Sequence, residues 1–319
     1  MTAAESQKSS KGKEFLAENK ILIVFIALFI IMSILRTDAF LTYTNITNLL
    51  KQISVNAILA TGMTVVMTTG SFDLSVGSVV GVSGIVVGLL ARGDAPILLA
   101  LLSGIVVGAI FGCLNGLAIA KFKIPSFIVT LAMMQAARGL SFMFSEGFPV
   151  TGFSEEYLFI GQGYILGIPV PVYIMAAVVI VFAVIMAKTK YGRHVYFIGG
   201  NEEAGAISGI HVFRVRVVSH TLCGLLAGVA AIVLTFRVGS AMPAAGEGYE
   251  MDAIAASVIG GCSLNGGISK ISGTLIGALI LGLISNGMNL LGITTYPQMV
   301  IKGVIIFVAV LLDTRTNKK

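Results

Sequence analysis

The side chains that could perform catalysis are few in this 319-residue chain, and their spacing points away from an active site. The three histidines, His194, His211 and His220, lie on or near one basic segment without the spacing of metal ligands. We expect them to be exposed or to cap helices. The three cysteines lie in apolar or glycine-rich stretches with no paired spacing, which favours small core residues over a disulfide framework. We therefore expect no metal, no cofactor and no catalytic residue.

Two polar, glycine-rich segments break long hydrophobic runs, at residues 70–78 and 260–267. Backbone at membrane depth can be irregular only where it is buried in protein or faces a water-filled cavity. Interruptions at corresponding places in two halves of a chain indicate the working centre of a transporter. The predicted hinge residues in these segments are Gly70, Gly77, Gly261 and Gly266.

Asp73 is the one acid in the first broken segment. A carboxylate at this depth must pair, cap a helix or touch water. Its position predicts an N-cap that accepts a hydrogen bond from an amide two or three residues on, and direct contact with a transported molecule is the alternative. Residues 261–266 have the glycine spacing of a phosphate-binding loop, but Gly267 and Ile268 follow in place of Lys and Ser or Thr. We therefore do not expect this chain to bind ATP by itself.

The elements that must position these segments are membrane helices. The chain is 56% hydrophobic and 11% charged, with a mean hydropathy of +0.96, which leaves too little polar surface for a soluble domain. We predict an all-α polytopic membrane protein with about ten transmembrane helices, broken near the midplane. The predicted spans are 21–35, 53–69, 74–91, 97–120, 124–144, 170–187, 217–236, 254–264, 271–290 and 300–312. Glycines at every fourth position from Gly104 to Gly116 predict one face for close helix packing.

Basic residues predict the orientation. With the N-terminus inside, most of the 21 Lys and Arg residues fall in cytoplasmic segments, as the positive-inside rule requires. The exceptions, outside or within spans, are Arg36, Lys51, Arg92, Arg138, Arg237 and Lys302. Both termini are thus predicted to be cytoplasmic, and the net charge of +6 reflects topology and not nucleic-acid binding. The predicted divisions are a tail at 1–20, a transmembrane domain at 21–313 with an inner loop at 188–214, and a tail at 314–319.

Three stretches resemble one known family. They are Thr69-Gly70-Ser71-Phe72-Asp73-Leu74-Ser75-Val76-Gly77-Ser78, the stretch from Gly192-Arg193 through Gly199-Gly200-Asn201-Glu202-Glu203-Ala204 to Ser208-Gly209-Ile210, and Gly248-Tyr249-Glu250-Met251-Asp252-Ala253-Ile254-Ala255-Ala256. Through them the chain is similar to permease subunits of ribose-type ABC sugar importers from about residue 46 to 313. It departs from that family at Ser71-Phe72, where Gly-Ile is usual.

The resemblance implies that the chain works with separate subunits in the bacterial cytoplasmic membrane. These are a cytoplasmic ATP-binding subunit, an extracytoplasmic sugar-binding protein, and a second permease copy or a close paralogue. Ribose is the leading cargo. Galactose, xylose, allulose-like sugars, a signalling furanone and nucleosides stay open as alternatives.

Neutral polar side chains within or beside the spans suit a polyhydroxyl cargo. The predicted pathway residues are Phe72, Asp73, Ser75, Asn115, Gln135, Asn265, Asn286 and Asn289. The bulk of Phe72 could narrow the path or stack on a sugar ring. Asn286 and Asn289 share a helix face because they are three residues apart. The alternative is that such groups only bridge helices, each bond contributing about 0.6 kcal/mol.

The inner loop carries the pattern of a short capped helix. Asn201 is a suitable N-cap, Glu202 and Glu203 place negative charge in the first turn, and Gly209 can end the helix in the left-handed conformation. A two-turn helix is marginal in water, so it needs a partner surface. The resemblance implies that this surface is a groove on the ATP-binding subunit, with a solvated loop as the alternative. The predicted coupling residues are Arg193, Gly200, Asn201, Glu202, Glu203, Ala204, Ser208 and Gly209.

Two other functions compete with this interpretation. A secondary transporter driven by an ion gradient needs charged residues buried along its path, and only Asp73, Arg138 and Lys302 are good candidates, without an obvious relay. An intramembrane enzyme needs a nucleophile with a base, or a metal site, such as a histidine facing a carboxylate. No such constellation is visible in the sequence.

Overall fold

The computed structural model describes residues 20–93 and 95–316, and most of them lie in helices. The helices are α2 (Lys20–Leu35), α3 (Tyr43–Thr68), α4 (Val76–Arg92), α5 (Ile97–Phe122), α6 (Ser126–Phe144), α7 (Glu155–Gln162), α8 (Val170–Lys188), α9 (Lys190–Gly200), α10 (Glu202–Ile207), α11 (Val212–Val238), α12 (Tyr249–Ile259), α13 (Ile271–Leu290) and α14 (Thr295–Thr316). Strands β1 (Tyr164–Ile165) and β2 (Ile168–Pro169) pair antiparallel, with Tyr164 opposite Pro169. The predicted tails at 1–20 and 314–319 lie largely outside the described residues.

Six helices in the described ranges are long and apolar enough to cross a membrane: α3, α5, α6, α8, α11 and α13. Helices α2 and α4 and the apolar part of α14 are shorter. The all-α membrane class is therefore confirmed, while the count of ten spans stays a prediction. Helix α12 has 11 residues, or about 16 Å at 1.5 Å per residue, which is roughly half of a bilayer core.

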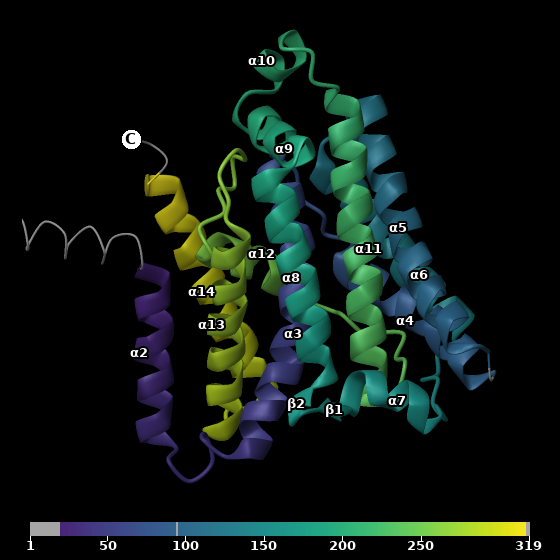
Figure 1. Ribbon diagram of the computed structural model, residues 1–319, viewed down its shortest axis with the longest axis vertical. Helices are drawn as coiled ribbons and strands as arrows, with labels where there is room; N and C mark the ends of the chain where they lie inside the picture. The colour runs from purple at the N-terminus through teal and green to yellow at the C-terminus, as the bar shows by residue number, and fades with distance from the viewer. Residues whose placement is uncertain (1–19, 94, 317–319) are drawn as a thin grey trace, which may run out of the picture.

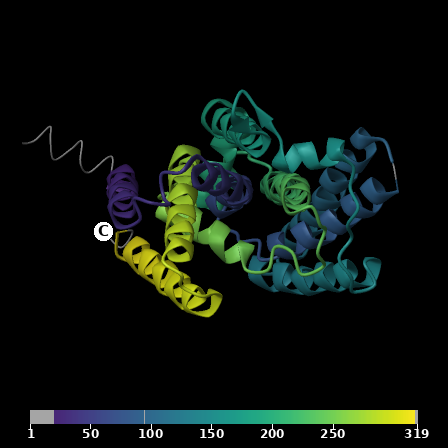
Figure 2. The ribbon, with the colours of Figure 1, turned by 90° about the horizontal axis from the view of Figure 1, so that it is seen from below.

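The long helices run side by side along the long axis of the molecule (Figure 1). Helices α9 and α10, from the predicted inner loop, lie at one end, and α7 with the β1–β2 hairpin lies at the other. Viewed from below, α2 and α14 lie on one side of the bundle and α4, α5 and α6 on the opposite side (Figure 2). The predicted inner and outer loops thus lie at opposite ends.

Helix α3 is the centre of the bundle. Of its most apolar 18 residues 78% are buried, against 17% for α6. A helix that is hydrophobic all round belongs in a core, whereas α5, α6 and α8 present exposed apolar side chains such as Leu98 and Ile180, which suits lipid. These peripheral helices therefore present apolar surface of the kind that faces lipid.

The predicted glycine face on α5 packs against α11. A Cβ atom added at Gly108 would collide with the carbonyl oxygen of Gly224, and one at Gly112 would collide with that of His220. The two backbones therefore approach as closely as small residues allow, as expected for helix packing in a bilayer. This contact buries one face of α11.

Candidate functional site

The two predicted broken segments meet in space. The first follows α3 and the second joins α12 to α13. The backbone amide of Gly267 donates to the carbonyl oxygen of Thr68 at 2.9 Å, and the hydroxyls of Thr68 and Ser269 lie 2.7 Å apart. Segments separated by about 200 residues in sequence therefore form one structural unit.

The predicted hinge glycines serve different purposes. Gly70, Gly261 and Gly266 have φ of +77°, +89° and +86°, a conformation that favours glycine because it has no Cβ. Gly77 instead lies within α4, where an added Cβ would collide with the carbonyl oxygen of Gly246 and the carboxylate of Glu250. Gly77 is thus a close-packing position and its backbone does not turn.

The end of α9 completes this unit. A Cβ added at Gly199 would collide with the carbonyl oxygen of Thr68 and would lie 2.6 Å from the amide nitrogen of Gly267. The hydroxyl of Tyr196 donates to the carbonyl oxygen of Ser269 at 3.1 Å. We call residues 68–70, 199–200 and 266–269 the glycine junction. Sequence reasoning did not assign Gly199 a role, although the Gly199-Gly200 pair inside a helix was a signal for close backbone approach.

Asp73 lies in a buried polar cluster with Ser75 and Asn115. One carboxylate oxygen, Oδ1, accepts from the amide of Ser75 at 2.9 Å and also from its hydroxyl. Asn115 Nδ2 lies 3.3 Å from both oxygens of Asp73 and 2.9 Å from the Ser75 hydroxyl. These three side chains are 1%, 0% and 0% exposed, so the cluster is closed to solvent in this conformation.

The expected N-cap role of Asp73 is corrected. The predicted bond to an amide two residues on is present, but α4 begins at Val76 and Ser75 occupies the N-cap position. Asp73 therefore fixes the turn that precedes the helix, because its carboxylate folds back onto Ser75.

The expectation for His220 was wrong. Its side chain is fully buried, because it lies on the face of α11 that packs on α5. His220 Nδ1 is 3.5 Å from Oδ2 of Asp73, without the geometry of a hydrogen bond, and Nε2 has no hydrogen-bond partner among the described residues. A histidine facing a carboxylate is thus present, contrary to the sequence interpretation, and the Ser75 hydroxyl adjoins that carboxylate, but all three side chains are buried.

Asn286 and Asn289 do not converge with this cluster. Asn286 and Asn45 exchange hydrogen bonds of 2.8 and 3.2 Å between α13 and α3, which is the helix-bridging alternative. Asn289 is exposed and accepts from Gln298 at 2.8 Å, so it does not act with Asn286.

Two further pathway candidates also lie apart from this cluster, whereas Phe72 directly precedes Asp73 in the chain. Gln135 is on the exposed surface of α6, and Asn265 is exposed in the loop beside the glycine junction. The backbone amide of the half-buried Phe72 donates to the Ser126 hydroxyl at 3.1 Å. The eight candidates therefore mark several places and not one continuous path.

The capped helix predicted in the inner loop is present as α10. Asn201 accepts from the amide of Ala204 at 2.9 Å, and Gly209 has a φ of +81° just beyond the helix end. Glu202 pairs with Arg216 at the start of α11. Gly200 belongs to α9 and not to this helix. Ile207, which was not among the predicted coupling residues, is 88% exposed and leaves an apolar side chain at the tip of the inner end.

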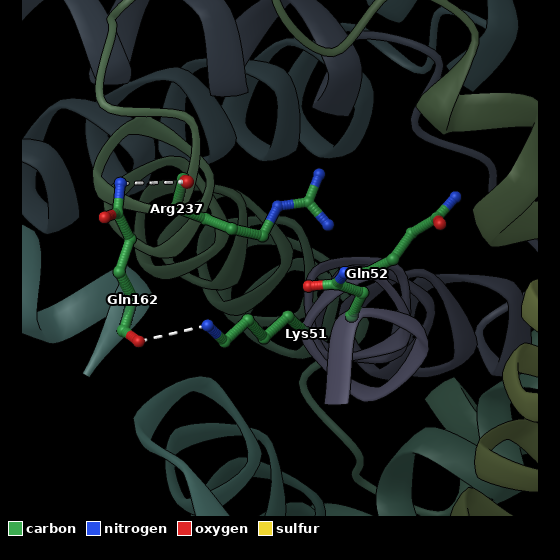
Figure 3. Close-up of a pocket in the computed structure, with 5 residues that line it drawn as sticks. Lys51, Gln52, Gln162 and Arg237 are labelled. Atoms are coloured by element: carbon green, nitrogen blue, oxygen red, sulfur yellow. Dashed lines mark hydrogen bonds between the residues drawn. The ribbon is translucent and has the colours of Figure 1, made fainter. Parts of the chain in front are cut away.

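A polar pocket opens at the opposite end of the bundle. It has a volume of about 520 Å³, and its lining residues are Asn48, Lys51 and Gln52 of α3, Gln162 of α7 and Arg237 of α11. Lys51 Nζ donates to the carbonyl oxygen of Gln162 at 3.0 Å, and Gln162 Nε2 donates to that of Arg237 at 3.3 Å (Figure 3). These bonds hold the three helices around the pocket.

The charged residues considered for an ion relay lie apart from each other. Arg138 donates to the carbonyl oxygens of Pro243 and Ala245 at 2.7 and 2.8 Å. Lys302 of α14 pairs with Asp252 of α12 at 2.9 Å, beside a second pocket of about 570 Å³. Each cation is thus engaged locally, and neither is bonded to the Asp73 cluster in the described residues.

The chain is similar to known transport proteins over most of its length. Residues 45–310 match the family described as branched-chain amino acid transport system, permease component. The chain is 46% identical over 298 residues to the ribose import permease protein RbsC of Bacillus subtilis (strain 168), covering 92% of each chain. It is 45% identical to RbsC of Escherichia coli (strain K12), covering 96% of each chain, and 38% identical to the L-arabinose transport system permease protein AraH of the same strain, covering 93% of this chain and 90% of that one. No solved structure matches the chain.

Proposed function

The chain belongs to this family of transport-system permease components, and from that premise we propose that it is the membrane-spanning subunit of an ATP-driven importer of a pentose, with ribose as the first candidate. The observation that carries the proposal is similarity along nearly the whole chain to proteins named as ribose import permeases. The arabinose permease is a more distant relative, which ranks arabinose second.

The proposed assembly has separate parts. An ATP-binding subunit docks on the inner end, an extracytoplasmic sugar-binding protein docks on the outer end, and a second copy or a paralogue completes the pathway. The chain lies in the bacterial cytoplasmic membrane with both termini inside and about ten membrane-embedded helices, α12 entering only part of the bilayer. The six apolar helices and the opposite placement of the two loops support this topology.

Helix α10 is proposed as the element that docks into the ATP-binding subunit. It is held by the Asn201 cap and exposes Ile207, whose burial in a groove would remove apolar surface from water. Helix α9 then connects α10 to the glycine junction, and through it to α3, α4 and α13. Movement of α10 when the ATP-binding subunits close would thereby be transmitted to both broken segments at once.

A secondary transporter is the weaker alternative. It needs a chain of buried ionisable groups, and Arg138 and Lys302 are already bonded elsewhere. Asp73 lies beside His220, and both side chains are buried in this conformation.

Purification from the membrane followed by uptake into vesicles tests the proposal. The expected result is co-purification of an ATP-binding subunit and ribose uptake that requires ATP and the sugar-binding protein. A non-hydrolysable ATP analogue is the matched control, and arabinose, xylose, galactose and leucine complete the cargo panel. Uptake that follows an imposed ion gradient without ATP would refute the importer assignment.

A further inference from the structure

The outer pocket contains two cations without an acidic partner. Lys51 and Arg237 both line it, and neither forms a salt bridge with any described carboxylate. Lys51 as a whole is only 9% exposed, and its ammonium group donates a hydrogen bond to a neutral carbonyl oxygen, that of Gln162. A largely buried cation without a counter-charge is costly unless a ligand supplies one.

Both cations lie at the predicted outer end of the bundle. Basic residues are depleted on the outer side of membrane proteins, and this chain has only six that are not in predicted cytoplasmic segments. Of these, Arg36 pairs with Asp38 and Lys302 with Asp252, but Lys51 and Arg237 come from different helices to one pocket. Their convergence is not a consequence of local sequence, because α3 and α11 are far apart in the chain.

The walls of the pocket keep both cations in place. Lys51 Nζ has one hydrogen bond to Gln162 and lies 4.3 Å from the centre of the Tyr164 ring. The side chain of Arg237 extends from α11 toward α3 (Figure 3). Asn48, Lys51 and Gln52 share a face of α3 by their spacing, so amide groups stand beside the charges. Arg, Lys and amide groups together donate many hydrogen bonds to an oxygen anion.

We propose that this pocket binds a carboxylate side chain of the extracytoplasmic sugar-binding protein and so aligns that protein over the permease. The inference rests on the proposed importer function. Charge complementarity selects this occupant, because a neutral sugar does not compensate two positive charges, whereas an Asp or Glu on a docking partner does. Such a contact would affect the rate at which the two proteins associate and the orientation in which they dock. It would affect the transport step itself less.

Binding of the sugar-loaded partner to the assembled complex in phosphatidylcholine nanodiscs tests the proposal. In the double variant Lys51→Met and Arg237→Gln, the dissociation constant should rise about tenfold or more, and its dependence on salt should flatten. The exchange Lys51→Arg with Arg237→Lys keeps both charges and should retain most of the affinity. Arg36→Gln, which removes an outer cation that already has a partner, is the matched control.

A charge swap identifies the partner group. Replacing acidic residues of the sugar-binding protein one at a time with Lys should weaken binding at one position, and the permease variant Lys51→Glu should restore binding for that variant alone. Wild-type affinity and salt dependence in the double-neutral variant, with ATP-driven uptake intact, would overturn the docking inference and leave the importer assignment standing. Equal loss of affinity with Arg36→Gln would overturn it too. So would saturable binding of ribonate, inorganic phosphate or anionic lipid at this pocket without any effect on partner binding.

Discussion

Replacing Gly199 with Ala should separate ATP hydrolysis from transport. The added methyl group would collide with the carbonyl oxygen of Thr68, which belongs to backbone and cannot rotate away as a side chain could. The end of α9 must then move away from the glycine junction. Overpacking of this kind costs about 1–3 kcal/mol, and 2 kcal/mol corresponds to about thirtyfold in the equilibrium that holds the junction closed.

The neighbouring glycine provides a matched control. A Cβ at Gly200 meets no atom within 4 Å, and alanine is preferred to glycine in a helix. Gly200→Ala should therefore match the wild type or be slightly more stable. Tyr196→Phe removes only the two hydrogen bonds between the Tyr196 hydroxyl and Ser269, so it is a milder perturbation of the same junction and should show an intermediate effect.

The assay is sugar transported per ATP hydrolysed in proteoliposomes, together with co-elution of subunits and the thermal midpoint of the complex. In Gly199→Ala we expect an assembled complex that hydrolyses ATP with much less transport per ATP. Wild-type coupling in Gly199→Ala would refute the role of the junction. If Gly199→Ala fails to assemble, Tyr196→Phe becomes the test. A normal ratio of sugar transported to ATP hydrolysed in Tyr196→Phe would likewise refute the role of the junction.

Three further predictions concern the inner end, the buried cluster and the helix bridge. Ile207→Asp should leave the thermal midpoint of the isolated permease unchanged, because the side chain is 88% exposed, but should abolish co-elution of the ATP-binding subunit; retained co-elution would exclude Ile207 from the interface. Asp73→Asn should lower the free energy of unfolding by about 1–3 kcal/mol, because a buried hydrogen-bonded carboxylate is lost. Unfolding in denaturant measures this free energy, and an unchanged value would show that the cluster is not stabilising. A double-mutant cycle with Asn45→Leu and Asn286→Leu should give a coupling of about 0.6 kcal/mol, and sugar specificity should not change; altered specificity would return Asn286 to the pathway.

The sequence by itself determined the long apolar helices and the caps of one short helix. Hydrophobic runs located all six long apolar helices, and the pattern from Asn201 to Gly209 predicted α10 with its cap. These features depend on residues within a few positions of each other, so their chemistry can be recognised without a fold. The positive φ at Gly70, Gly261 and Gly266 was predictable for the same reason, since glycine in a broken segment marks a turn.

Only the tertiary structure decided which side chains meet. His220 was expected to be exposed or to cap a helix, but it is buried beside Asp73. Sequence alone could not show this, because the lipid-facing side of a membrane helix is as apolar as its protein-facing side. The sequence left open whether Asn286 bridges helices, and only the structure identified Asn45 as its partner. The contact of Gly199 with Thr68 and the convergence of Lys51 with Arg237 join helices remote in the chain, and packing of those helices, not local propensity, brings them together.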